Sequence, residues 1–144
     1  MKKIVCLVVV VLMIAAVAIA AKKTAINAKN LSDLKGTWTG ILSFGVYDIG
    51  GTSPVTLEIL NDSVPVKAKL TVKNVPEVVA AQFGQISGLK VAEADDGVIT
   101  SQGTLMWTGP AKNFFEVTLQ DNKKLSLWYF FRGMKGDATL TKKK

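Results

Sequence analysis

The sequence has no histidine, and its only cysteine is Cys6, near the start of the chain. Histidine is the most common general base near neutral pH and a usual ligand of zinc and copper. Without histidine or a later cysteine, nucleophilic pairs of the Ser-His and Cys-His kinds are excluded from the rest of the chain. Only carboxylates, lysines and hydroxyls remain for catalysis. We therefore expect a protein that is not an enzyme and that holds no metal or other cofactor.

Arginine is almost as scarce, with Arg132 as its single instance among 18 basic residues. Proteins that bind nucleic acid usually combine arginine with interleaved aromatic residues on a basic face, so no nucleic acid partner is expected. The formal charge of +7 comes mainly from lysine. Five lysines stand in two groups that we interpret as solvated tails with a weak attraction for anionic surfaces: Lys22, Lys23, Lys142, Lys143 and Lys144.

A long apolar run does occur, from Ile4 to Ala21, with two lysines on each side of it. A basic start, an apolar stretch and small residues at Ala18 and Ala20 are typical of a secretory signal with an A-x-A cleavage site. We predict that residues 1–20 are a signal peptide and that the protein is secreted or periplasmic. The run has 18 residues, close to the roughly 20 that span a bilayer. The alternative is an uncleaved membrane anchor that holds the domain outside the cytoplasm.

From Gly36 onward, short runs rich in valine, isoleucine, threonine and aromatic residues alternate with glycine, proline, asparagine and aspartate, as in an all-β meander. We predict about eight strands, near residues 36–46, 54–60, 64–73, 86–93, 97–108, 113–120, 124–132 and 136–142. An antiparallel meander of this size avoids exposed edges by closing on itself. The predicted fold is an all-β up-and-down barrel over residues 36–142. A lead-in segment, 21–35, precedes it with one helical turn at 31–34, and residues 77–83 are a candidate short helix or lid.

The clearest strand pattern lies between residues 64 and 72, where apolar residues alternate with lysine, threonine and proline. Successive side chains of a strand point to opposite sides, so Ala68 and Leu70 are expected on one face and Lys67 and Lys69 on the other. The runs at 55–59 and 115–119 repeat this pattern. One face of each strand is therefore expected to be buried and the other to be exposed to solvent.

The first predicted strand begins with Gly36-Thr37-Trp38, and Arg132 follows the aromatic end of a late strand. This combination resembles the calycins, the group that contains lipocalins, fatty-acid-binding proteins and avidins. The resemblance implies that Trp38 plugs one end of the barrel and that Arg132 packs across its ring as a cation–π partner. It covers the architecture from about 36 to 142 and carries no particular ligand over to this chain.

The aromatic residues are numerous enough that several must point into the barrel. A small eight-stranded barrel is just wide enough to be filled by its own side chains or to hold one small ligand. Leu42, Trp107 and Tyr129 are the candidate lining of such a ligand cup. The predicted function is that of an exported lipocalin-like protein that binds a small apolar or amphipathic molecule, and a filled core is the alternative.

The predicted strand at 124–132 has apolar residues on both faces near its end. Trp128 and Phe130 are the surplus, because a barrel strand needs only one apolar face. They are either covered by the chain's own ends or exposed as a patch for a partner. The second reading favours a different function, an interaction or inhibitor module in the cell envelope with a filled barrel.

Overall fold

The computed structural model describes residues 22–46, 49–74, 90–108, 114–121, 123–131 and 133–144. The predicted signal peptide or anchor and the candidate lid at 77–83 lie outside these residues. No helix in the described part of the chain has the length and apolar character needed to cross a membrane.

One helix and nine strands are found in these residues. The helix is α2 (Leu31–Leu34), as expected for the lead-in, and it follows the two-residue strand β1 (Lys23–Thr24). The eight longer strands are β2 (Gly36–Val46), β3 (Ile49–Ile59), β4 (Val66–Val72), β5 (Lys90–Ile99), β6 (Leu105–Thr108), β7 (Phe114–Gln120), β8 (Leu125–Phe131) and β9 (Met134–Lys142).

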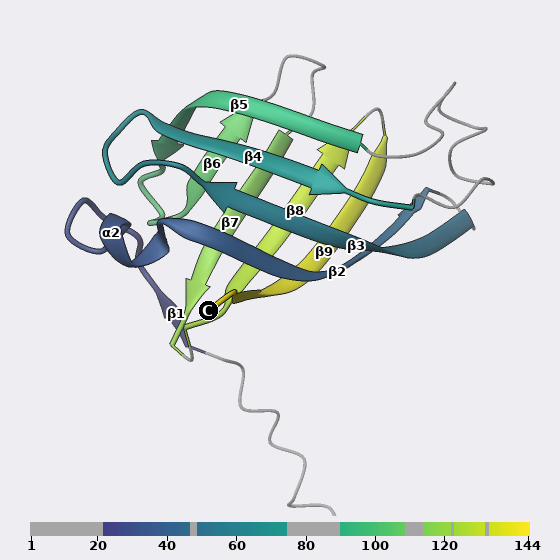
Figure 1. Ribbon diagram of the computed structural model, residues 1–144, viewed down its shortest axis with the longest axis horizontal. Coiled ribbons are helices and arrows are strands. Elements are labelled where there is room, and N and C mark those ends of the chain that lie inside the picture. The colour runs from purple at the N-terminus through teal and green to yellow at the C-terminus, as the bar shows by residue number, and fades with distance from the viewer. Residues whose placement is uncertain (1–21, 47–48, 75–89, 109–113, 122, 132) are drawn as a thin grey trace, which may run out of the picture.

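The strands form a closed barrel (Figure 1). Each strand from β2 to β8 pairs antiparallel with the next, and β9 returns to pair with β2, for example at Trp38 and Lys142. The predicted all-β, eight-stranded, up-and-down barrel is thus confirmed. This architecture is compatible with that of the calycins.

The alternation of burial along each strand follows the alternation of residue types. Every second side chain of β4 is buried, from Val66 to Val72, while Lys67 is exposed and Lys69 is half-buried. The same period along β2, β3, β7, β8 and β9 produces one cluster of buried apolar residues inside the barrel. All members of this cluster lie between Ile26 and Leu140, so residues 22–144 contain the complete described core.

The predicted strands at 86–93 and 97–108 are wrong in their boundaries. Strand β5 continues past residue 93 to Ile99, and the turn comes later, at residues 100–104. Thr100 and Gly103 make this turn, in which Gly103 has a φ of +71° and its N–H donates to the Thr100 carbonyl at 3.0 Å. The sequence predicts a strand boundary after residue 93, with Gly97 as the first residue of the next strand. The structure shows that it lies in a strand where no side chain fits.

The lead-in segment closes one end of the barrel, which we call the closed end. There β1 pairs with the last residues of β7, and the Ile26 N–H donates to the Gly103 carbonyl at 2.8 Å. Ile26, Leu31 and Leu34 are each only 1% exposed. The connections at 60–65, 100–104 and 121–124 lie at this same end.

Candidate functional site

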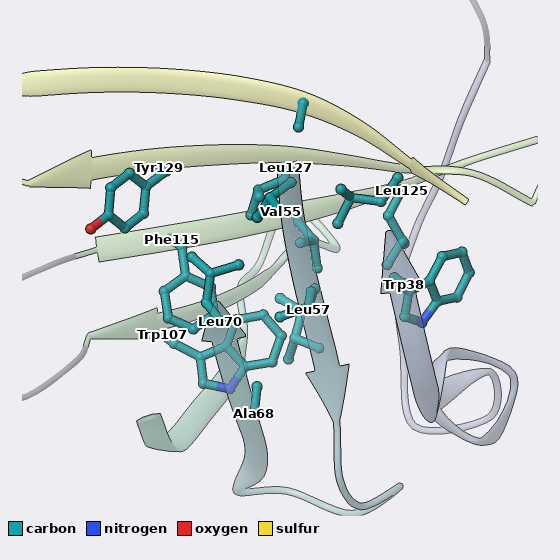
Figure 2. Packing of buried hydrophobic residues seen from close by; sticks show 14 of the residues in the cluster. Trp38, Val55, Leu57, Ala68, Leu70, Trp107, Phe115, Leu125, Leu127 and Tyr129 are labelled. Atoms are coloured by element: carbon teal, nitrogen blue, oxygen red, sulfur yellow. The ribbon is translucent and has the colours of Figure 1, made fainter. Parts of the chain in front are cut away.

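The three predicted cup residues all lie inside the barrel. A side chain that lines a water-sized cavity exposes part of its surface to that cavity, whereas Leu42, Trp107 and Tyr129 are 0%, 1% and 2% exposed. Figure 2 shows Trp107 and Tyr129 in the same cluster as Leu57 and Leu127, with Trp38 at its other end. In the described part of the chain, the three side chains are buried within the apolar cluster of the barrel. Their role in ligand binding stays a prediction that requires the core to open.

Trp107 is anchored in the interior by a ring contact and a hydrogen bond. Its ring stacks on Phe115, with 5.0 Å between centroids and 18° between planes. Its indole N–H donates to the Val66 carbonyl at 2.6 Å. The β4–β5 register is irregular between Val66 and Ala68, and such an irregularity takes backbone groups out of the regular ladder. Because its only donor is used in this way, Trp107 has no hydrogen bond to offer a ligand in its present position.

Trp38 lies at the closed end, as the resemblance to calycins implies, and it is 2% exposed. Its indole N–H donates to the Leu34 carbonyl at 2.7 Å, which ties β2 to α2. The Lys142 ammonium lies 5.6 Å from the centroid of this indole and donates to the Asp33 carbonyl at 2.7 Å. Arg132, the expected partner of Trp38, lies outside the described residues. Sequence reasoning interpreted Lys142 as part of a solvated tail and missed this cation–π contact.

A depression of about 570 Å³ lies at the closed end. Its walls come from the lead-in, from the β7–β8 connection and from Lys142 at the end of β9. Two lysines and two aspartates line it, so its own charge is balanced: Asp33, Asp121, Lys123 and Lys142.

The outer wall of the barrel carries an aromatic patch, which consists of Phe114, Trp128 and Phe130. Trp128 is 39% exposed, and its ring contacts Phe114 edge-on at 5.3 Å and lies nearly parallel to Phe130 at 6.2 Å. Phe114 pairs directly with Phe130 across β7 and β8. The sequence singles out Trp128 and Phe130 as either covered by the chain's ends or exposed as a patch, whereas Phe114 was missed. The short gap between the predicted strands 113–120 and 124–132 would have indicated it, because a short connection sets the register that brings Phe114 opposite Phe130.

Charged residues of both signs border the aromatic patch. Glu116 and Asp137 are the two cross-strand neighbours of Trp128, on β7 and β9. Lys135 is the neighbour of Phe130 on β9. An apolar centre with a mixed polar rim is the usual composition of a protein–protein interface.

Among the described residues, no group of three or more aspartate, glutamate, histidine or cysteine side chains is placed to hold a metal ion. No protein family model, curated protein or solved structure matches this chain. The aromatic patch is therefore the candidate functional site, chosen on its own geometry.

Proposed function

We propose that this protein is a protein-binding module: a β-barrel with a filled interior that docks a protein partner through the aromatic patch. The observation that carries the proposal is the exposed contact cluster of Trp128 with Phe114 and Phe130 on the outer wall. Burying aromatic side chains against a partner is strongly favourable, and tryptophan is among the residues that dominate interface energies. Exposure in the native cell envelope, after export, is part of the proposal.

The rim of the patch favours a protein over other partners. The carboxylates of Glu116 and Asp137 on both sides of Trp128 would repel nucleic acid and anionic lipid headgroups. Trp128 is the only exposed residue of the patch, at 39%, since Phe114 and Phe130 are half-buried. A glycan that stacks on a row of exposed rings is less well matched by this arrangement. A partner with an apolar centre and charges of both signs fits it.

Site-directed photocrosslinking tests the position of the docking surface. A benzophenone side chain in place of Asp137 is expected to form one discrete adduct with a protein in the native host, since Asp137 borders Trp128. The matched control carries the same group in place of Val98, which is 42% exposed on β5. A Trp128→Ala change in the Asp137 crosslinking variant should abolish the adduct. An adduct that forms equally from both positions, or that survives Trp128→Ala, would contradict the proposal.

Substitutions in the patch should weaken binding to the crosslinked partner without unfolding the barrel. Truncation of a central tryptophan typically costs about 2 kcal/mol or more, so we expect Trp128→Ala to raise Kd by about 30-fold. Val98→Ala, which removes apolar surface of similar exposure, should change Kd by less than about threefold. Titration calorimetry measures both values.

The free energy of unfolding of Trp128→Ala should fall by only about 1 kcal/mol, the size of its ring contacts. A urea titration checks this value. A much larger loss would mean that Trp128 acts in stability, and the binding result would then not count for the proposal.

The function predicted from the sequence, binding of a small apolar or amphipathic ligand in the interior, is tested separately by native mass spectrometry of protein from its own host. A co-purifying lipid whose binding is lost in Tyr129→Ala and retained in Trp128→Ala would favour the cup over the patch. An apo mass together with a patch-dependent adduct is the result that the proposed function expects.

A further inference from the structure

The charges of the barrel are distributed very unevenly between its closed end and the rest. The closed end comprises the lead-in 22–35, the connections 60–65, 100–104 and 121–124, and the terminal residues 142–144. These segments carry nine lysines and three aspartates, a formal charge of +6. The remainder of the described residues carries five basic and six acidic residues. The net positive charge of the domain is thus concentrated at one end.

Because of its nine lysines, we call the closed end the basic end. These lysines come from parts of the sequence that lie far apart in the chain and that only the fold brings together. The Asp121 N–H donates to the Lys22 carbonyl at 3.0 Å, and the Lys143 N–H donates to the Thr37 carbonyl at 2.8 Å. Figure 1 shows β1 and the C-terminus at the same end of the barrel. All nine lysine side chains are exposed: Lys22, Lys23, Lys29, Lys35, Lys123, Lys124, Lys142, Lys143 and Lys144.

The chain that precedes the barrel enters at this end. Lys22 and Lys23 directly follow the apolar run from Ile4 to Ala21. If this run is retained as a membrane anchor, the closed end is the part of the barrel joined directly to it and would face the headgroups. A lysine contributes to membrane attraction only within about one Debye length of an anionic surface. The basic end meets that condition better than any other described part of the domain.

We propose that the basic end is a docking surface for anionic lipid headgroups. In this orientation the closed end of the barrel faces the membrane surface. The nine lysines attract the surface by charge, and no headgroup needs to enter a formed pocket. This surface is separate from the aromatic patch, and the proposal does not rest on the proposed function. Membrane docking through the basic end is compatible with the proposed function, because Trp128 and Phe130 pair with β9 toward the opposite end of the barrel.

The composition of the basic end favours lipid over nucleic acid. None of its nine cations is an arginine. Arginine is the preferred residue for bidentate hydrogen bonds to phosphate and for stacking on bases. The aromatic residue at this end, Trp38, is 2% exposed and offers no stacking surface. Simple point charges spread over one end suit a fluid anionic surface, to which they are attracted without fixed geometry.

Vesicle co-sedimentation of residues 22–144 tests this proposal, since this stretch contains the whole described core and is expected to fold on its own. We expect binding to vesicles of phosphatidylcholine mixed with phosphatidylglycerol and none to vesicles of phosphatidylcholine alone. Each lysine near the surface contributes about fivefold in affinity. Binding should be lost in about 1 M salt, where the Debye length is about 3 Å.

Two variants with the same net charge separate the basic end from general charge attraction. Lys29→Gln combined with Lys35→Gln removes two charges of the basic end, and affinity should fall by about tenfold or more. Lys73→Gln combined with Lys135→Gln removes two exposed charges from the opposite half of the barrel. The second variant should bind nearly as well as the unaltered chain. Circular dichroism confirms that both variants are folded.

Fluorescence of the bound protein reports its orientation. Trp38 and Trp107 are buried and Trp128 is exposed, so aqueous acrylamide should quench Trp128 equally on vesicles and in solution. Loss of quenching on vesicles would place the aromatic patch in the membrane and overturn the proposed orientation. Equal weakening in the two lysine variants, absence of binding at low salt, or tighter lysine-dependent binding to DNA than to anionic vesicles would overturn the proposal itself.

Discussion

Replacing Gly97 with alanine is expected to destabilise the barrel by about 3 kcal/mol or more. A Cβ at this position would clash with the Trp107 indole nitrogen and would lie 2.5 Å from the Val66 carbonyl oxygen. Neither neighbour can move away easily, because the Trp107 N–H is bonded to that same carbonyl and Val66 pairs with Gly97 in the sheet. A small domain has only about 5–15 kcal/mol of stability in total. A urea titration followed by circular dichroism measures the loss.

A second glycine provides the matched control for this experiment. A Cβ at Gly50 would meet the Phe44 carbonyl oxygen at 3.1 Å as its nearest neighbour, so Gly50→Ala should cost about 1 kcal/mol or less. Trp107→Phe removes the indole atoms that oppose a Cβ at Gly97. The Gly97→Ala and Trp107→Phe changes are therefore expected to be coupled by about 0.5–3 kcal/mol. A stable Gly97→Ala variant without such coupling would contradict the packing described for Trp107.

Truncation of Trp38 is expected to open the closed end of the barrel. Trp38 is 2% exposed, and replacing a buried tryptophan with alanine costs about 3–5 kcal/mol. Trp38→Ala also leaves the Leu34 carbonyl without its indole donor. We therefore expect α2 and the lead-in to lose local stability before the rest of the barrel does. Hydrogen exchange should show faster exchange of the Lys35 N–H, which donates to the Leu31 carbonyl at 3.3 Å, than in the unaltered protein.

The cation that accompanies Trp38 can be identified by a pair of substitutions. Lys142→Gln removes the ammonium that lies over the ring, and a cation–π contact at an exposed site contributes about 0.5–1 kcal/mol. That contribution should disappear in the Trp38→Leu background, whereas Arg132→Gln should have the same effect in both backgrounds. Coupling between Trp38 and Arg132, and none between Trp38 and Lys142, would instead support the pair that the resemblance to calycins implies.

The strand pattern was predictable because burial in a sheet follows a period of two residues. The alternation around Ala68 and Leu70 identifies the inner face of β4 without any knowledge of its neighbours. Closure of the barrel was predictable from the same pattern. An antiparallel meander of eight strands has two unpaired edges, at its first and last strands, and these edges can pair with each other.

The region from 86 to 108 was not predictable in the same way. Two aspartates before Gly97 are typical of a turn, and local propensity therefore placed a strand boundary there. The packing of Trp107 against Gly97 comes from a different strand, and it decides that this glycine lies within β5. Here the tertiary contact that buries the Trp107 ring outweighs the local turn signal, because strand preference depends on packing against neighbouring strands.

The aromatic patch was also only partly predictable from the sequence. Surplus apolar residues on β8 were enough to single out Trp128 and Phe130, because a one-sided strand has no use for them inside. The third member, Phe114, joins them only through the pairing of β7 with β8. The aromatic patch is thus partly visible in one strand and complete only in the sheet.

Local pattern alone was enough to predict an all-β barrel and the inner and outer faces of its strands, because each of these depends on neighbours along the chain. The signal peptide or anchor at the start of the chain stays a prediction. Only the folded barrel decided that Trp107 is buried against Phe115, that Lys142 lies over Trp38, and that nine lysines gather at one end. These properties depend on closure, which brings β9 beside β2 and places residues from the two ends of the chain on the same surface.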